Sequence, residues 1–133
     1  MQPLLLEIPN RIETERLYLR PYQAGDGPLI YAVGKRNHEH LAQYEAGNFL
    51  NHLRDEQHAE IVVRELALNW MARKHFFMGV YHNQTHQWVG QVYLGPTNWE
   101  IPEFSIGYVA DVEQQGLGYI TEAVKACLLY TSP

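Results

Sequence analysis

Hydrophobic and polar residues alternate near the start of the chain. Within Glu13–Tyr22 (ETERLYLRPY), Leu17 and Leu19 point to one side, and the residues between them point to the other. A period of two is typical of a β-strand with one buried face, and Pro21 is expected to end it. The segment therefore predicts one half-buried strand.

The next two hydrophobic segments have a helical period. Asp26 stands where it can cap a helical stretch over residues 28–44, which we expect to break near Gly34–Asn37. Residues 52–75 carry the longest helical pattern, with apolar residues three and four positions apart on one face. That face consists of Ala59, Val62, Val63, Leu66, Ala67 and Trp70.

Three strands are expected in the second half of the chain. Residues 75–82 and 87–96 are apolar, rich in aromatic residues and separated by the turn sequence NQTHQ, which predicts a β-hairpin. Residues 103–110 (EFSIGYVA) form another strand after a loop that contains proline. Three consecutive strands favour an α+β fold with a mainly antiparallel sheet flanked by helices over a parallel, doubly wound sheet.

A glycine turn leads into the last predicted helix. Glycines at 116 and 118 precede a segment whose apolar stripe consists of Ile120, Ala123, Val124, Cys127 and Leu128. The first N–H groups of a helix lack intrahelical partners, so such a turn can bind an anion such as a phosphate. The spacing fits neither a Walker phosphate loop nor a dinucleotide fingerprint, and a plain tight turn stays open as the alternative.

The amino-acid composition and net charge of the chain exclude several classes of function. The 133 residues suit one domain, and a net charge of −5 lacks the basic surface that nucleic-acid binding needs. A single cysteine and the absence of a signal peptide or a long apolar run favour a cytoplasmic protein that does not bind membranes. None of the seven histidines has the spacing of a zinc hydrolase, so we expect no metal.

The segment IGYVADVEQQGLGYITEAVKA resembles the acetyl-CoA-binding motif of the GCN5-related N-acetyltransferases (the GNAT superfamily), in the branch that acetylates ribosomal-protein N-termini. Gly107-Tyr108 matches the family's strand, Asp111 its loop, Gln115 to Gly118 its turn and Thr121-Glu122-Ala123 its helix start. The resemblance spans residues 12–128 and implies a GNAT-like sheet.

The resemblance implies a coenzyme site built from backbone groups. The N–H groups of residues 115–120 would hold the pyrophosphate of acetyl-CoA, and residues 108–110 would pair with its pantetheine arm. The cofactor-binding residues are then Tyr108, Val109, Ala110, Gln115, Gly116, Leu117, Gly118, Tyr119 and Ile120. The family prefers Gly or Ala where this chain has Ile120, which either crowds the phosphates or faces the core.

The resemblance also implies how the amine would be activated. Relatives often carry a carboxylate base on the strand before the turn, where Ser105 stands here. Glu103 lies on the same face of that strand and is our candidate base, with Glu100 behind it. A solvated carboxylate at the end of a strand is the alternative for Glu103. A backbone N–H near Val109 would polarise the carbonyl.

The end of the sequence predicts an incomplete domain. The family continues with a fifth strand and a helix that carries the general acid, and both would be missing here. We expect one partial domain over residues 1–133, with native sequence ending near Cys127 or Leu128 and a non-native tail over residues 129–133. A genuinely short protein is the alternative.

These observations predict an acetyl-CoA-dependent N-acetyltransferase. It would transfer the acetyl group directly, in a ternary complex, to a primary amine of a protein N-terminus or a small molecule. A non-catalytic module that binds coenzyme A or another phosphate ligand, and an inactive fragment, remain alternatives. The sequence defines neither the acceptor nor the oligomeric state.

Overall fold

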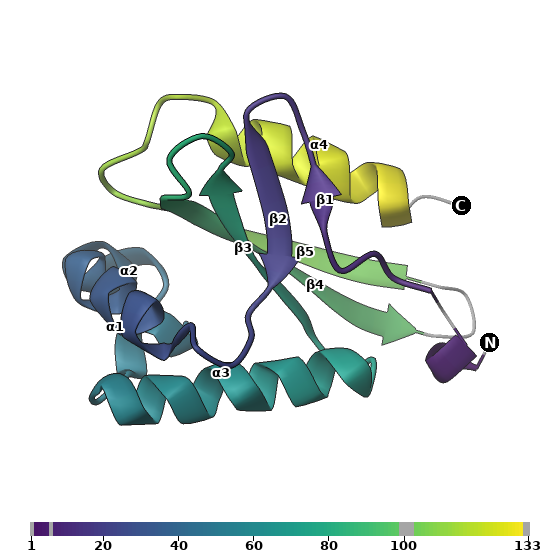
Figure 1. Cartoon of the computed structure of the whole chain (residues 1–133), viewed down its shortest axis with the longest axis horizontal. Helices are drawn as coiled ribbons and strands as arrows, with labels where there is room; N and C mark the ends of the chain where they lie inside the picture. The colour runs from purple at the N-terminus through teal and green to yellow at the C-terminus, as the bar shows by residue number, and fades with distance from the viewer. Residues whose placement is uncertain (1, 6, 99–102, 132–133) are drawn as a thin grey trace.

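The computed structural model describes residues 2–5, 7–98 and 103–131, which form a mixed α+β fold. Figure 1 shows the sheet with α1, α2 and α3 on one face and α4 on the other. The elements in chain order are the 3-10 helix η1 (Pro3–Leu5), β1 (Ile12–Glu13), β2 (Leu17–Pro21), α1 (Gly27–Arg36), α2 (His38–Tyr44), the 3-10 helix η2 (Phe49–His52), α3 (Glu56–Met71), β3 (Phe76–His82), β4 (Trp88–Asn98), β5 (Glu103–Ala110) and α4 (Tyr119–Thr131).

Within the described residues, the sheet has five strands in the order β1-β2-β3-β4-β5, and every neighbouring pair is antiparallel. The predicted hairpin of β3 and β4 is confirmed. The expectation that the fifth strand and everything after it would be missing is wrong. One strand was predicted over Glu13–Tyr22, but the chain reverses after Glu13, so β1 and β2 pair with each other.

Strand β2 is buried on both faces, which corrects the prediction of a half-buried strand. Leu17 and Leu19 are fully buried on the α4 side, and Tyr18 between them is only 7% exposed. Tyr18 stacks on Tyr81 of β3 with ring centroids 5.2 Å apart. Helices pack on both faces of the sheet, and the face of β2 that was predicted to be exposed buries the aromatic ring of Tyr18.

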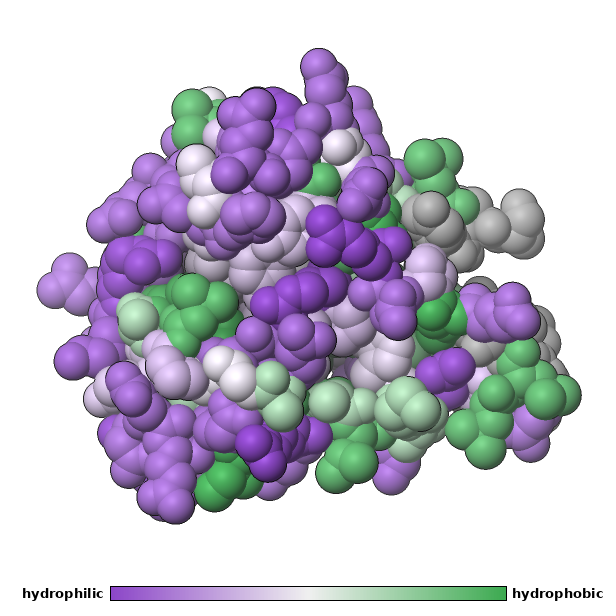
Figure 2. Space-filling view, in the orientation of Figure 1, coloured by the Kyte–Doolittle hydropathy of each residue, from purple (hydrophilic) through white to green (hydrophobic). Residues whose placement is uncertain are grey.

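Two hydrophobic clusters lie on opposite sides of the sheet. The cluster on the α4 side includes Leu17, Leu19, Met78, Val80, Val92, Ala123, Ala126 and Cys127. The cluster under α1, α2 and α3 includes Tyr18, Tyr22, Ile30, Val33, Leu41, Val63, Tyr81, Trp88 and Val109. Figure 2 shows that hydrophilic residues cover most of one face, interrupted by hydrophobic side chains along its lower edge, where α3 runs.

The predicted helical stripes are largely confirmed. In α3, Ala59, Val63 and Trp70 are buried, and in α4, Ala123 and Cys127 are buried. Leu128 was expected on the stripe of α4 but is 47% exposed. The neighbouring Ala126 packs into the core in its place.

The start of α1 differs from its prediction, although the break between α1 and α2 at Asn37 is confirmed. The side chain of Asp26 makes no capping bond. Its carboxylate accepts hydrogen bonds from the guanidinium of Arg20 at 2.8 and 3.0 Å. Glu60 of α3 binds the start of α1 instead, accepting from the amide of Gly27 at 2.9 Å. A distant residue therefore performs a role that local sequence assigned to Asp26.

The start of α4 is anchored to the turn between β1 and β2 by one carboxylate. Glu122 accepts hydrogen bonds from the hydroxyl of Thr14 at 2.5 Å, the amide of Arg16 at 3.0 Å and Nε of Arg16 at 2.7 Å. The Glu122 side chain is only 20% exposed. These three bonds join segments more than a hundred residues apart and fix where α4 begins.

A buried polar network joins β2 to β4. The hydroxyl of Tyr22 donates to Oε1 of Gln91 at 2.8 Å and accepts from Nε1 of Trp88 at 3.1 Å. Tyr22 is 1% exposed and Gln91 is 2% exposed, so water does not replace these partners. Burial raises the pKa of the Tyr22 phenol well above its ordinary value.

Replacing Glu122 with Gln should lower the free energy of unfolding at neutral pH by roughly 1–3 kcal/mol, since three hydrogen bonds lose a charged acceptor. Partial burial raises the pKa of Glu122, but the bonds from Thr14 and Arg16 outweigh it and hold the pKa below its usual 4.5. The stabilisation is therefore complete above that value and is lost as the pH falls through the lower folded pKa.

Urea unfolding from neutral pH down to about pH 3 measures this effect. The gap between the unaltered chain and the Glu122→Gln variant should narrow below about pH 4.5. The control is Glu65→Gln, at an exposed position of α3. A gap that stays constant with pH would show that the charge of Glu122 contributes no stability.

Replacing Tyr22 with Phe should destabilise the fold by about 1–3 kcal/mol, because Gln91 and Trp88 each lose a buried partner. The control is Tyr31→Phe, at a half-buried position beneath Lys35 on α1, with an expected change of about 0.5 kcal/mol or less. Urea denaturation midpoints compare the two variants. Equal midpoints for Tyr22→Phe and the unaltered chain would contradict the proposed role of the network.

Candidate functional site

The loop from β5 to α4 is anchored at its first end by the junction of α1 and α2. Asp111 is 2% exposed and accepts hydrogen bonds from Arg36 at 2.5 and 3.2 Å. The amide of Val112 donates to Oδ1 of Asn37 at 2.9 Å. The hydrogen bond to Asp111 raises the pKa of Arg36. The loop therefore leaves the sheet in a fixed direction.

Arg16 holds the other end of the loop. Its Nη1 donates to the carbonyl of Leu117 at 3.0 Å, and its guanidinium carbon lies 4.7 Å from the centroid of the Tyr119 ring. The ring of His82 packs edge to face against the ring of Tyr119, with the two ring centroids 5.8 Å apart. Together with the bonds to Glu122, these contacts place one cation directly beside the glycine turn.

The two glycines of the turn have left-handed backbone angles. Gly116 has a φ of 81° and Gly118 a φ of 78°, values that residues with a side chain rarely adopt. A Cβ on Gly116 would meet nothing within 4 Å, so the backbone of the turn is open to an approaching group. The first hydrogen bond of α4 runs from the amide of Glu122 to the carbonyl of Gly118. The amides of residues 119–121 precede that bond and form the positive end of the helix.

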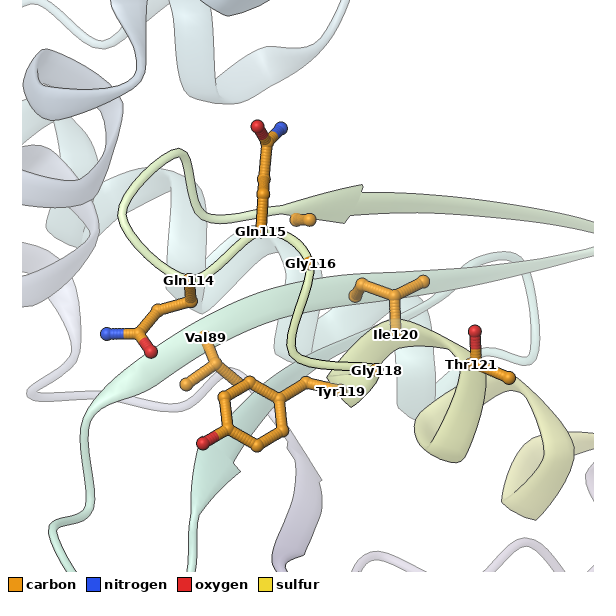
Figure 3. A pocket seen from close by; sticks show the side chains of 9 residues that line it. Val89, Gln114, Gln115, Gly116, Gly118, Tyr119, Ile120 and Thr121 are labelled. Atoms are coloured by element: carbon orange, nitrogen blue, oxygen red, sulfur yellow. The ribbon is translucent and has the colours of Figure 1, made fainter.

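A hollow of about 270 Å³ lies between this turn and the strands β4 and β5. Figure 3 shows the turn curving over the start of α4, with Ile120 and Thr121 on the first turn of the helix. The lining residues are Val89, Ala110, Gln114, Gln115, Gly116, Gly118, Tyr119, Ile120 and Thr121.

Ile120 reaches the sheet at Gly90. A Cβ on Gly90 would lie 2.5 Å from Cδ1 of Ile120 and 2.7 Å from the carbonyl oxygen of Val109. The glycine on β4 therefore makes room for the isoleucine on α4. Ile120 is half-buried and also lines the hollow, so it faces both the sheet and the candidate ligand space.

A second hollow of about 210 Å³ continues from the first toward α2. The two share Ala110, Gln115 and Ile120. The remaining lining residues of the second hollow are His40, Tyr44, Glu45, Tyr108 and Val109. The end of β5 therefore borders both hollows, one at the glycine turn and the other beside α2.

Most of the residues predicted to bind the coenzyme line these hollows, but Leu117 does not. Its side chain is 50% exposed and its carbonyl is bound by Arg16. Ser105 is exposed on β5, where its hydroxyl donates to the carbonyl of Gly95 at 3.4 Å, and it lines neither hollow. The side chain of Glu103 and the whole of Glu100 lie outside the described residues.

Sequence reasoning missed several residues of the site. Arg16 and Thr14 belong to a turn that was predicted as strand, and no local pattern links them to residue 122. His40 on α2 and Glu45 directly after α2 reach the second hollow, and the sequence could not place this helix next to β5. Gly90 did carry a signal, because an isolated glycine inside a strand pattern often marks a close approach of another group.

The described part of the chain comprises residues 2–5, 7–98 and 103–131. No three His, Cys, Asp or Glu side chains in this part of the chain are grouped so that they could hold a metal ion. None of its helices has both the length and the apolar character needed to cross a membrane.

Burial raises the pKa of the Cys127 thiol to about 11.

Solved structures of acetyltransferases share this fold. A Vibrio cholerae protein assigned as a ribosomal-protein-serine acetyltransferase has 27% identity and a TM-score of 0.74, covering 91% of this chain and 66% of its own. The ribosomal-protein-S5-alanine acetyltransferase of Vibrio fischeri has 22% identity and a TM-score of 0.76, covering 90% and 66%. RimL, a ribosomal L7/L12 α-N-protein acetyltransferase solved in complex with coenzyme A, has 16% identity and a TM-score of 0.78, with the same coverage.

The chain thus spans just under two thirds of the length of these proteins. A search of curated proteins found no significant match. A sequence model described as "Acetyltransferase (GNAT) domain" matches residues 16–132, nearly the whole chain. The chain therefore belongs to the GNAT acetyltransferase domain family.

Proposed function

We propose that this chain binds acetyl-CoA and transfers its acetyl group to a primary amine in a ternary complex. The glycine turn carries the proposal. Two left-handed glycines, the free end of α4 and the guanidinium of Arg16 surround a hollow beside the β5 backbone. Positive helix ends and open backbone amides suit a pyrophosphate. The solved relative RimL holds coenzyme A, which supports the same ligand for this chain.

The residues of the site fit the coenzyme. The backbone N–H groups of residues 115–120 bind the pyrophosphate, and a Cβ on Gly116 would meet no protein atom within 4 Å, so the backbone there can approach a phosphate closely. The backbone of residues 108–110 pairs with the pantetheine arm at the edge of the described sheet. When bound, acetyl-CoA supplies the activated acetyl group as a thioester.

The chain's own groups would activate the amine and the carbonyl. A backbone N–H near Val109 polarises the carbonyl oxygen. Glu103 of β5 is the candidate base, two residues before Ser105, which stands where the family resemblance implies a carboxylate. Removing a proton from the amine is necessary, because a protonated amine has no electron pair for attack on the thioester.

The acceptor is proposed to be the N-terminal amine of a protein, with a small-molecule amine as the alternative. The solved relatives described as ribosomal-protein acetyltransferases support a protein acceptor. The hollow beside α2 adds Glu45, whose carboxylate suits a cationic amine. We place the reaction in the cytoplasm, in keeping with a single buried thiol.

Hydrogen exchange tests the coenzyme site directly. Acetyl-CoA should slow the exchange of the amides of residues 115–120, because those N–H groups become donors to phosphate oxygens. Amides of the turn between β3 and β4 serve as the internal reference. Binding of acetyl-CoA with unchanged exchange at residues 115–120 would refute the phosphate-loop assignment. Binding without any acetyl transfer would instead favour a non-catalytic coenzyme module.

A valine at Gly118 should weaken acetyl-CoA binding at least about tenfold by calorimetry, because the side chain enters space beside the phosphates. The matched control is Gly25→Val, since Gly25 also has a positive φ, of 101°, but lies in the turn before α1. Both variants should lose similar stability from backbone strain, roughly 1–2 kcal/mol. Equal losses of affinity in the two variants would make Gly118 only a turn residue.

A further inference from the structure

The face of β5 on the same side of the sheet as α1, α2 and α3 carries polar side chains beyond the two hollows. Strand alternation puts Ser105 and Gly107 on the same face as Val109, which packs in the cluster under α1, α2 and α3. Tyr93 of β4 pairs with Gly107, so it lies next to the start of the segment proposed to bind pantetheine. The face of β5 that carries Ser105 therefore also includes a phenol from the neighbouring strand.

Tyr93 is hydrogen-bonded to a histidine. Its Oη lies 2.8 Å from Nδ1 of His75, at the junction of α3 and β3. The Tyr93 ring stacks on Phe77 with centroids 4.4 Å apart and an angle of 14°. His75 is exposed while Tyr93 is half-buried, so the pair leads from the sheet to solvent.

Two glycines leave the space around this phenol open. A Cβ on Gly95 would lie 2.5 Å from Oη of Tyr93 and 3.1 Å from Oγ of Ser105, so both hydroxyls border the same small region. A Cβ on Gly107 would lie 3.9 Å from the Tyr93 side chain. The hydroxyl of Tyr93 thus reaches the strand face that carries Ser105, the position where the family resemblance implies the base.

We propose that Tyr93 and His75 form a proton relay that deprotonates the acceptor amine, the role for which Glu103 was the candidate; the inference rests on the proposed acetyl transfer. Tyr93 Oη accepts a proton from the ammonium group while its own O–H proton passes to Nδ1 of neutral His75. The amine nitrogen then forms the C–N bond, the C–S bond breaks, and the electron pair leaves with sulfur. The thiolate takes up the second N–H proton through solvent, and His75 returns its proton to solvent.

The environment of Tyr93 explains why two residues are needed. Burial raises the pKa of the Tyr93 phenol, so at neutral pH it stays protonated and needs an acceptor for its own proton. Imidazole side chains commonly accept and release protons in this pH range. The exposed ring of His75 supplies that acceptor and exchanges its proton with water.

Matched variants test the relay. Tyr93→Phe keeps the ring on Phe77 and removes the hydroxyl, and His75→Asn keeps a polar partner that accepts no proton. The chain contains a second pair of the same kind, Tyr18 with Nδ1 of His86 at 2.9 Å, on β2 and in the turn between β3 and β4. Tyr18→Phe and His86→Asn are therefore the controls. Turnover is measured with acetyl-CoA and peptides that begin with serine or alanine, and with spermidine.

The relay predicts a selective loss of kcat. Tyr93→Phe and His75→Asn should each lower kcat roughly 100-fold, and the double variant should be no worse than either, because both remove one proton path. The acetyl-CoA Kd should stay within about two-fold, and both defects should shrink at high pH, where the free amine is already neutral. The controls should keep kcat. A kcat within about two-fold for either relay variant, or a defect independent of pH, would overturn the relay.

A measurement without turnover decides the direction of the relay. Nitrogen NMR of neutral His75 should show Nδ1 as the unprotonated nitrogen, with its shift altered in Tyr93→Phe. A protonated Nδ1 would overturn the relay. A chain that binds acetyl-CoA but acetylates none of the amines would overturn the relay and leave the coenzyme site standing. A chain that binds no coenzyme would overturn the proposed function as well.

Discussion

The carboxylate of Glu122 fixes the relation between the first strands and the last helix. It accepts three hydrogen bonds from Thr14 and Arg16, and Arg16 then reaches the carbonyl of Leu117. The glycine turn is therefore held from the sheet side while Asp111 and Arg36 hold its beginning. A turn fixed at both ends presents its amides in one arrangement, so less ordering entropy opposes ligand binding.

The candidate binding groups and the candidate catalytic side chains lie at different ends of β5. The helix end and the glycines lie at one end of the strand, near Ala110, while Ser105 and Tyr93 lie toward the other. A coenzyme bound along the strand would place its phosphates at the first end and its thioester nearer the second. In the proposed reaction, binding by backbone groups and proton transfer by side chains therefore lie at different ends of β5, so each can be perturbed without the other.

Local patterns in the sequence were sufficient for the elements whose partners are close along the chain. The β3–β4 hairpin, the buried stripe of α3 and the glycine turn before α4 follow from periodicity and turn residues. The reversal of the chain after Glu13 could not be predicted in this way, because Thr14 and Arg16 are held by Glu122, more than a hundred positions away. Asp26 failed as a cap because Arg20 binds its carboxylate and Glu60, from the separate helix α3, accepts the hydrogen bond from the amide of Gly27. The relay pair depends on strand register, which sequence alone leaves open.

The contact between Gly90 and Ile120 has a consequence for how this site varies among related proteins. The two positions share one volume, because a side chain on Gly90 would overlap Cδ1 of Ile120. A relative with glycine or alanine at the helix position has room for a side chain on the strand, whereas a branched residue on the helix requires glycine opposite. Residues 90 and 120 should therefore change together over evolution, as a compensating pair that conserves the width of the hollow.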